Sequence, residues 1–327
     1  MEHLPLHPAE SARPLVLLTA PQLRSSQTTQ SIMRDVLIAL TPALIAATVI
    51  FGLRAVLVVL TALVSCVGFE HLWCMLRRTP TTVSDLSAAV TGMLLAFNVP
   101  STCPLYMVVL GSFVAIVVTK ELFGGIGCNF ANPAIVGRIF LAVTFPVAMT
   151  TFALPQVTLA AAPLVDEVSS ATPLAPSAQL HSLMELLLGT HTGVLGETCA
   201  IALLVGFVYL LVRRVITWHV PVTYVGVVAL LSLLVGRDPL EQVLEGGLLL
   251  GAIYMATDYT TTPATLRGRV VFAVGCGLIT CLIRFWGNLN EGVAYSILFM
   301  NLLVPHIDVL VRNVPVGGER SGGGRRE

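Results

Sequence analysis

Charged side chains are scarce in this sequence. Asp, Glu, Lys and Arg make up 11% of its 327 residues, whereas apolar residues make up 55%. Soluble domains carry about 25% charged residues, so this chain has too few to cover a water-facing surface. We therefore predict an integral membrane protein that lies mostly in lipid. The formal net charge of zero gives no electrostatic reason to expect a nucleic-acid partner.

Clustered cysteines and the motifs of self-sufficient enzymes are also missing. The seven cysteines are scattered, and no Cys-x-x-Cys pair occurs. Zinc and iron–sulfur sites need several thiolates close together, so neither is expected within this chain. No phosphate-binding loop or nucleophile elbow is present. The first 35 residues contain only a short apolar stretch, 15–20, so we expect no cleaved signal peptide.

Long apolar runs dominate the rest of the chain. A bilayer core of ~30 Å requires ~20 apolar residues per helix. The sequence therefore predicts an all-α polytopic membrane protein with about ten transmembrane segments. These segments are 36–72 (two spans divided near Gly52), 85–100, 105–119, 134–153, 198–212, 220–235, 243–256, 270–283 and 293–311.

Basic residues are absent from one long stretch. No Lys or Arg occurs between Arg138 and Arg213. If the N-terminus is cytoplasmic, 14 of the 18 Lys and Arg residues, Lys120 included, fall inside the cell, whereas three, Arg284 among them, fall outside. The positive-inside rule favours this orientation, with both termini cytoplasmic. The predicted regions are a cytoplasmic segment 1–35, a first membrane repeat 36–153, an external loop 154–195, a second membrane repeat 196–311 and a disordered cytoplasmic tail 312–327.

The two membrane regions show traces of internal duplication. An odd number of spans in each half inverts the second half, so the pattern favours two inverted five-helix repeats. Each half also has a short apolar segment that ends in polar residues, 94–104 and 253–263. We expect broken helices there, whose free backbone groups need a partner and mark a binding site. A shift of 159 residues matches Gly92 with Gly251, Pro104 with Pro263 and Asn129 with Asn288.

A glycine-rich loop, Phe-Gly-Gly-Ile-Gly-Cys-Asn-Phe-Ala-Asn-Pro-Ala, covers residues 123–134. Its glycines allow positive φ, and Asn132 with Pro133 can cap and start the next helix. Such a helix start offers N–H donors to an anion or a flavin oxygen, although an ordinary cytoplasmic turn is an equal alternative. The candidate residues for a flavin or ion site are Asn98, Gly127, Asn129, Asn132 and Asp258.

Four charged residues near or inside the apolar segments need an interpretation. Asp258 is a lone acid at a membrane boundary, where a solvated loop acid is the favoured interpretation over an ion or cofactor ligand. Glu70 and Glu121 are interpreted in the same way. Arg138 lies well inside a predicted span and therefore needs a partner or an anionic ligand.

The external loop carries the strip Asp-Glu-Val-Ser-Ser-Ala-Thr, which ends at Thr172. Pro173 biases Thr172 toward extended geometry, which suits docking into a modifying enzyme. On the residues alone, a polar loop whose hydroxyls satisfy turns is the favoured interpretation.

Six stretches together resemble the family that contains the D subunits of Rnf electron-transport complexes and the B subunits of sodium-pumping NADH:quinone reductases. The chain length favours the Rnf members, because the quinone-reductase relatives carry a longer N-terminal region. The stretches are 30–46, 84–97, 120–150, 166–175, 254–263 and 291–308.

The resemblance implies that Thr172 carries FMN through a phosphoester bond, attached by a flavin transferase. Ser170 stands where glycine is commoner, and both are small. A second, non-covalent flavin, riboflavin, is implied within the membrane part. The residues that the transferase would recognise are Asp166, Ser169, Ser170 and Ala171.

The same resemblance implies a bacterial inner-membrane complex that exchanges electrons between ferredoxin and NAD and moves Na⁺ or H⁺. This subunit would not be catalytic alone. It would relay electrons on the outer face, beside other Rnf subunits that include a second FMN-carrying one. Two other classes stay open: a passive inverted-repeat channel or carrier, and a structural scaffold with an unmodified loop. Neither needs the Thr172 strip.

Overall fold

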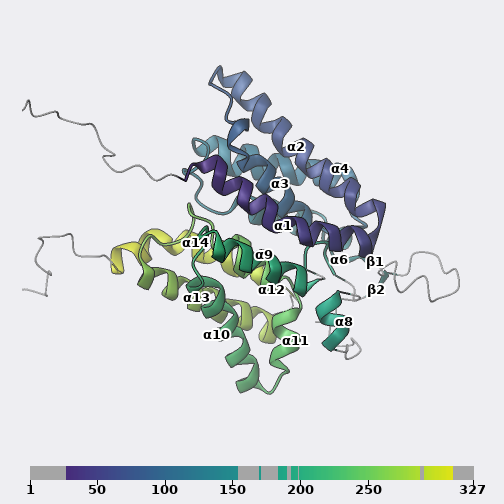
Figure 1. Cartoon of the computed structure of the whole chain (residues 1–327), viewed down its shortest axis with the longest axis vertical. Helices are drawn as coiled ribbons and strands as arrows, with labels where there is room; N and C mark the ends of the chain where they lie inside the picture. Colours follow the sequence, from purple (N-terminus) through teal and green to yellow (C-terminus); the bar gives the residue numbers. More distant parts are fainter. Residues whose placement is uncertain are drawn as a thin grey trace, which may run out of the picture.

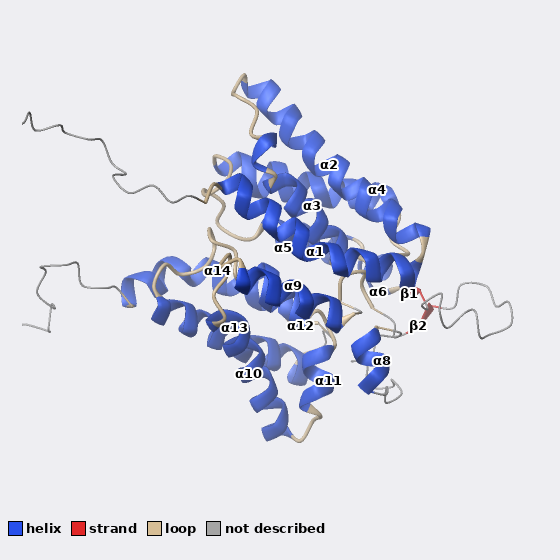
Figure 2. Ribbon diagram, viewed as in Figure 1, coloured by secondary structure: helices blue, strands red, loops and turns tan. Residues whose placement is uncertain are grey.

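The computed structural model of the chain describes residues 27–153, 169–170, 183–189, 193–197, 199–287 and 291–311 (Figure 1). Helices form nearly all of its regular structure, as Figure 2 shows. The predicted tail 312–327 lies outside the described residues, as do most of the predicted segment 1–35 and most of the external loop 154–195.

The first half of the chain contains two long helices followed by shorter ones. Gly52, with φ of 71°, separates the first two, as the sequence predicts. The elements are α1 (Thr29–Phe51), α2 (Leu53–Arg77), η1 (Val83–Asp85), α3 (Ser87–Phe97), α4 (Leu105–Phe113), η2 (Val114–Lys120), η3 (Glu121–Phe123), α5 (Pro133–Thr144), α6 (Pro146–Thr150) and β1 (Phe152–Ala153).

The second half repeats this succession in outline. Its helices pack below the first half in Figure 1, where α1 lies along α9 and α5 contacts α14. The elements are β2 (Ser169–Ser170), α8 (Leu183–Leu188), α9 (Ala200–Val212), α10 (His219–Val235), α11 (Pro239–Leu244), α12 (Leu248–Leu250), η4 (Gly251–Met255), α13 (Leu266–Trp286) and α14 (Val293–Leu310).

The length of the helices corrects the predicted number of full spans. Within the described ranges, five helices are long and apolar enough to cross a membrane: α1, α2, the continuous run Leu105–Phe123, α13 and α14. Four others, α3, α5, α9 and α10, are apolar but only 10–17 residues long. The all-α polytopic fold is confirmed apart from the two-residue strands β1 and β2, whereas ten full spans are not found in this part of the chain.

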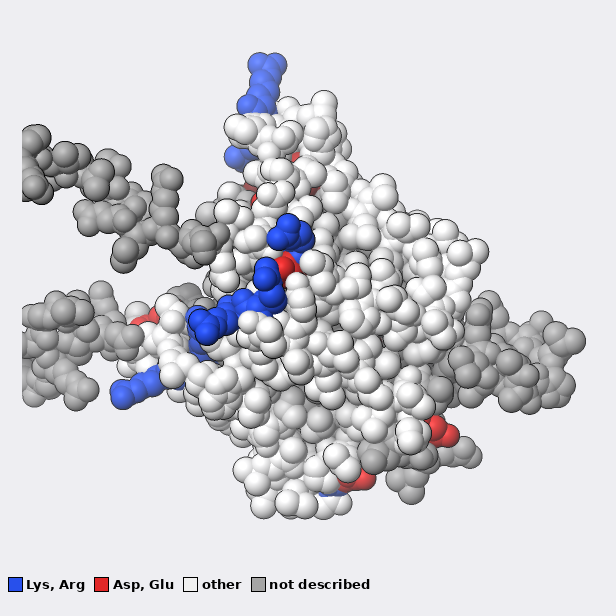
Figure 3. Space-filling model, viewed as in Figure 1, with Lys and Arg blue, Asp and Glu red and all other residues white. Residues whose placement is uncertain are grey.

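The surface fits a membrane environment. Many large apolar side chains are exposed on the outer helices, for example Val64 on α2 and Leu234 on α10, each 72% exposed. Figure 3 shows a broad uncharged face, with Lys and Arg gathered at the top and left of the view. Exposed apolar side chains at this density are favourable in lipid and costly in water.

The two predicted broken helices are present and stop close to each other. The first, α3, ends at Phe97, and the second, α12 with η4, ends at Met255. The Asn98 side-chain nitrogen lies 3.6 Å from the sulfur of Met255. Both helices stop in buried surroundings, so their last carbonyl groups cannot be satisfied by bulk water.

Each half supplies the partner for the helix end of the other half. The carbonyl oxygens of Phe97 and Val99 accept hydrogen bonds from the backbone of 193–197, at 2.9 and 3.3 Å. The carbonyl oxygen of Met255 accepts one from the Asn132 side chain at 3.4 Å. This reciprocal arrangement supports the inference of a structural repeat.

Replacing Gly92 by alanine is expected to destabilise the protein by about 1–3 kcal/mol, the usual effect of overpacking a close contact. A Cβ on Gly92 would lie 2.9 Å from the carbonyl oxygen of Ala62 on α2. Gly68→Ala is the matched control, because nothing lies within 4 Å of a Cβ there. Thermal unfolding in detergent measures both variants, and equal melting temperatures would contradict the packing argument.

Candidate functional site

One pocket lies where the halves meet, beside the glycine-rich loop. Apolar side chains of α1, α3, α9 and η4 form most of its wall. It encloses about 760 Å³ of empty space, counted with the part open to solvent. Small-molecule sites usually have roughly 300–1,000 Å³, mostly apolar walls and a few placed polar groups. The polar groups here include Asn129, Asn132, Asp258 and Thr260.

A hydrogen-bonded network fixes three of these polar groups. The Asn129 amide donates to the Thr260 hydroxyl at 3.0 Å, and that hydroxyl donates to the Asp258 carboxylate at 3.2 Å. Thr261 donates to the same carboxylate oxygen at 3.3 Å. Burial raises the pKa of the Asp258 carboxyl, and the bonds from Thr260 and Thr261 oppose that change. The interpretation of Asp258 as a solvated loop acid is therefore wrong.

The start of α5 follows the predicted local rules. Gly124, Gly125 and Gly127 have φ of 116°, 90° and 90°. The Asn132 side-chain oxygen accepts from the backbone N–H groups of Ala134 and Ile135 at 3.0 and 3.4 Å, so the predicted cap is confirmed. These two donors are consequently used within the chain. The expectation that the helix start offers them to an anion needs this correction.

The structure brings together only some of the predicted site residues. Asn129, Asn132 and Asp258 line the pocket, whereas Gly127 belongs to the same loop without lining it and Asn98 lies elsewhere. The motif of the external loop is described only at Ser169 and Ser170, which form β2. Asp166, Ala171 and Thr172 lie outside the described residues.

Arg138 has the partner that its position in an apolar helix requires. Its guanidinium donates to the Asn98 side-chain oxygen at 3.0 Å and forms an ion pair with Glu291. Sequence reasoning missed Glu291, although a shift of 159 residues matches it with Asn132, the residue before the last helix of the first half. Arg138 thus joins the end of one broken helix to the entry of α14.

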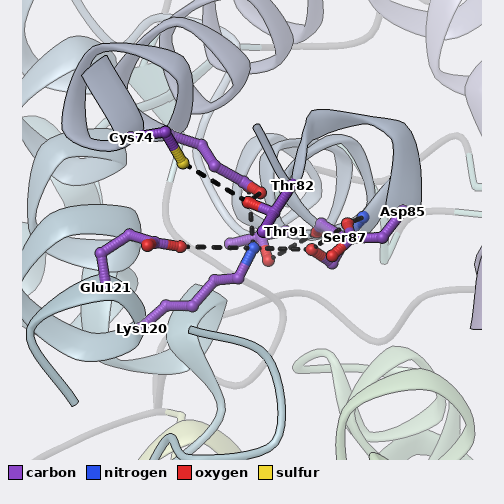
Figure 4. Close-up of polar contacts among 8 residues, drawn as sticks. Cys74, Thr82, Asp85, Ser87, Thr91, Lys120 and Glu121 are labelled. Carbon is purple, nitrogen blue, oxygen red and sulfur yellow. Dashed lines mark hydrogen bonds and ion pairs between the residues drawn. The ribbon is translucent and has the colours of Figure 1, made fainter. Parts of the chain in front are cut away.

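A second buried ion pair holds α2, α3 and η2 together (Figure 4). Lys120 donates to the Glu70 carboxylate at 2.8 Å and to the Ser87 hydroxyl at 2.6 Å, and it lies 3.7 Å from Glu121. Glu70 is fully buried and also accepts from Thr82. The interpretation of Glu70 and Glu121 as solvated acids is wrong, and Lys120 is buried rather than solvated in the cytoplasm. A charge inside apolar packing is retained only when it is paired.

Interrupted helices beside a ligand-sized pocket, with buried charges paired across two halves, define a class: polytopic membrane proteins that bind a small molecule or ion within the bilayer. The sequence profile of the NQR2, RnfD, RnfE family matches residues 16–317. The chain therefore belongs to that family, and the resemblance inferred from its motifs is confirmed.

Three relatives, each the D subunit of its complex, make the family assignment more specific. The chain is 42% identical to that of the Na(+)-translocating ferredoxin:NAD(+) oxidoreductase complex of Acetobacterium woodii, over 90% of this chain and 92% of the relative. It is 39% identical to that of the Proton-translocating ferredoxin:NAD(+) oxidoreductase complex of Clostridium ljungdahlii, over 92% and 96%. It is 36% identical to that of the Ion-translocating oxidoreductase complex of Stutzerimonas stutzeri, over 89% and 93%.

Arg138→Gln is expected to lower the free energy of unfolding by about 3–5 kcal/mol, because it leaves Glu291 without its cation. Adding Glu291→Gln to this variant should recover part of the loss, since the uncompensated charge is removed. Arg267→Gln, at an exposed position, is the control. Chemical unfolding of the purified protein tests the three variants. A single variant as stable as the control would show that the pair contributes little.

Proposed function

We propose that this chain is the D subunit of an Rnf-type complex and relays electrons through FMN esterified to Thr172. Two of the relatives bear names with ferredoxin:NAD(+) oxidoreductase activity. The observation that carries the proposal is the seven-residue strip from Asp166 to Thr172, which provides the acid, the small residues and the acceptor hydroxyl. The flavin supplies the redox chemistry, and the chain supplies its placement.

The β1–β2 pair supports this placement. Phe152 pairs with Ser170 and Ala153 with Ser169, so the two serines of the strip are joined to the end of the first half. In Figure 1 this pair lies at the right edge, opposite to the end of α14. The arrangement supports a flavin on the outer face and a cytoplasmic C-terminus. Thr172 follows Ser170 by two residues, which ties a tethered ring to the surface of the membrane part.

We further propose that the pocket beside the glycine-rich loop holds the non-covalent flavin, riboflavin. Its apolar walls suit a flat aromatic ring and exclude water. The Asn129 and Asn132 amides are available as donors and acceptors for the polar edge of a flavin, and Asp258 orients Thr260 toward Asn129. These residues would bind and orient the ring, and the flavin would supply one-electron steps when bound.

The proposed setting is the bacterial inner membrane, with both termini in the cytoplasm. The partners are other Rnf subunits, one of them carrying a second covalent FMN, and a flavin transferase that matures Thr172. The complex would couple electron transfer to movement of Na⁺ or H⁺, with ferredoxin and NAD bound by other subunits.

A passive channel or carrier is the second candidate function. The specific observation in its favour is the pair of broken helices that meet between the halves, an arrangement common in secondary transporters. A passive protein has no need of an esterified flavin, so the following experiment separates the two functions.

Thr172→Ala is expected to abolish covalent flavin, because the acceptor hydroxyl is removed. The full chain is expressed with an active flavin transferase, and in-gel flavin fluorescence is followed by mass measurement of the peptide that holds residue 172. Thr192→Ala, a threonine outside the strip, is the control and should keep one added FMN. An unlabelled wild-type chain, despite a transferase shown to label another substrate, would favour the passive function.

Asn129→Leu should weaken binding of the non-covalent flavin about tenfold, because one hydrogen-bond partner contributes ~1.4 kcal/mol. Cys128→Ser, at the exposed neighbouring position, is the matched control. The measurement is the ratio of acid-extractable riboflavin to covalent FMN in the purified complex. Equal ratios in both variants would place the second flavin outside this pocket.

A further inference from the structure

Buried polar atoms without a hydrogen-bond partner are concentrated at one place. Among the described residues, seven side-chain atoms have this property, and five of them belong to a single group of residues. Leaving such an atom unsatisfied costs about 1–3 kcal/mol, and native structures contain few of them. The five atoms are Glu197 Oε2, Gln242 Oε1, Glu245 Oε1, Glu245 Oε2 and Arg284 Nε.

The group surrounds the turn that joins α11 to α12. Glu245 begins this turn, and its side chain is almost fully buried, at 1% exposure. Glu197 approaches from the segment before α9: a Cβ on Gly247 would lie 2.8 Å from Glu197 Oε2. Gly247, at φ of 67°, therefore leaves the space that the Glu197 carboxylate uses.

Arg284 holds the turn in place without neutralising the carboxylates by hydrogen bonds. Its guanidinium donates to the backbone carbonyl oxygens of Gln242, Glu245 and Gly246, at 2.5, 3.1 and 3.0 Å. Sequence reasoning placed Arg284 outside the membrane, whereas the structure buries it to 7% exposure. The signal that was missed is the single Arg near the end of an otherwise apolar α13.

The charges of this group do not balance. Glu197 and Glu245 face one guanidinium, that of Arg284. Arg138 also faces Glu197, but it is paired with Glu291. One excess negative charge therefore lies among buried atoms, where an uncompensated charge is strongly unfavourable. A single positive charge from outside the chain restores the balance.

The chemistry of the free atoms indicates which positive charge. Four of the five are oxygens, and carboxylate and amide oxygens are the ligands of hard cations. Two carboxylates make a strong local field, which favours a small alkali ion over a larger one. We propose that Glu197, Gln242 and Glu245 form a buried binding site for one Na⁺ ion at the start of the broken helix α12–η4.

A proton competes for the same site. Burial and the neighbouring Glu241 raise the pKa of the Glu245 carboxyl to about 8, against the opposing effect of Arg284, and Glu197 adds to the increase. Glu245 thus carries a proton at neutral pH unless Na⁺ replaces it, and binding of Na⁺ releases that proton. The apparent affinity for Na⁺ should fall by about tenfold for each pH unit below 8.

The test uses the complex that contains the full chain, extracted in mild detergent with choline in place of Na⁺. NaCl is titrated at constant ionic strength, and amide hydrogen exchange is followed in peptides that cover 193–197 and 239–250. We expect saturable protection of both peptides by Na⁺ at pH 8, little protection by K⁺, and half-saturation that shifts with pH as stated. Absence of Na⁺-dependent protection in the wild type would overturn the proposal.

Matched variants assign the effect to these residues. Glu245→Gln and Glu197→Gln should each raise the half-saturating Na⁺ concentration at least tenfold and remove its pH dependence in the case of Glu245. Glu241→Gln removes the same charge from the adjacent helix and should leave protection nearly unchanged. Glu245→Gln also mimics the protonated residue, so it should fold. Unchanged half-saturation in a folded Glu245→Gln complex would refute the site. Thr172→Ala should bind Na⁺ like the wild type, so the outcome is independent of the proposed flavin.

Discussion

Two helices stop inside the apolar part of this protein, and the carbonyl groups that their ends free need partners that lipid cannot provide. The end of α3 receives them from the backbone of 193–197, and the end of η4 receives one from Asn132. Each partner comes from the opposite half of the chain. The halves therefore cannot separate without exposing buried polar groups. The pocket, the Arg138 ion pair and the turn near Glu245 all lie next to these reciprocal contacts.

The three buried basic groups show three ways to keep a charge in apolar surroundings. Lys120 binds Glu70 directly, and the pair fastens helices of one half. Arg138 pairs with Glu291 and fastens one half to the other. Arg284 donates to backbone carbonyl groups, which leaves two neighbouring carboxylates without hydrogen-bonded partners. Buried ion pairs are at best weakly stabilising, whereas a lone buried charge costs several kcal/mol, on the order of 3–5. Only the third arrangement therefore calls for an additional ion.

Local rules allowed the sequence to predict much of the fold. The break at Gly52, the cap at Asn132 and the positive φ of the loop glycines depend on neighbouring residues alone, and all are found. The need of Arg138 for a partner followed from one charge in an apolar helix, although the partner itself did not. Long-range pairing was not predictable in the same way. Lys120 reaches Glu70 across 50 residues of sequence, and a rule that counts lysines as cytoplasmic cannot detect it.

The broken helix α12–η4 links the two regions to which we assign ligands. It begins at the turn that carries Glu245 and ends three residues before Asp258, beside the pocket. Its sides are tightly fixed: a Cβ on Gly251 would lie 2.4 Å from Val293, and the Tyr254 hydroxyl donates to the carbonyl oxygen of Ala39 at 3.1 Å. A segment held this closely cannot deform gradually, because packed interiors resist small changes of volume. A change of charge at either end is therefore transmitted as a movement of the whole segment or through Arg138, whose contact with Asn98 lies beside the end of η4. Exchange of a proton for Na⁺ at Glu245 and reduction of a flavin near Asp258 would act on the same rigid element, which provides a physical basis for coupling ion binding to electron transfer.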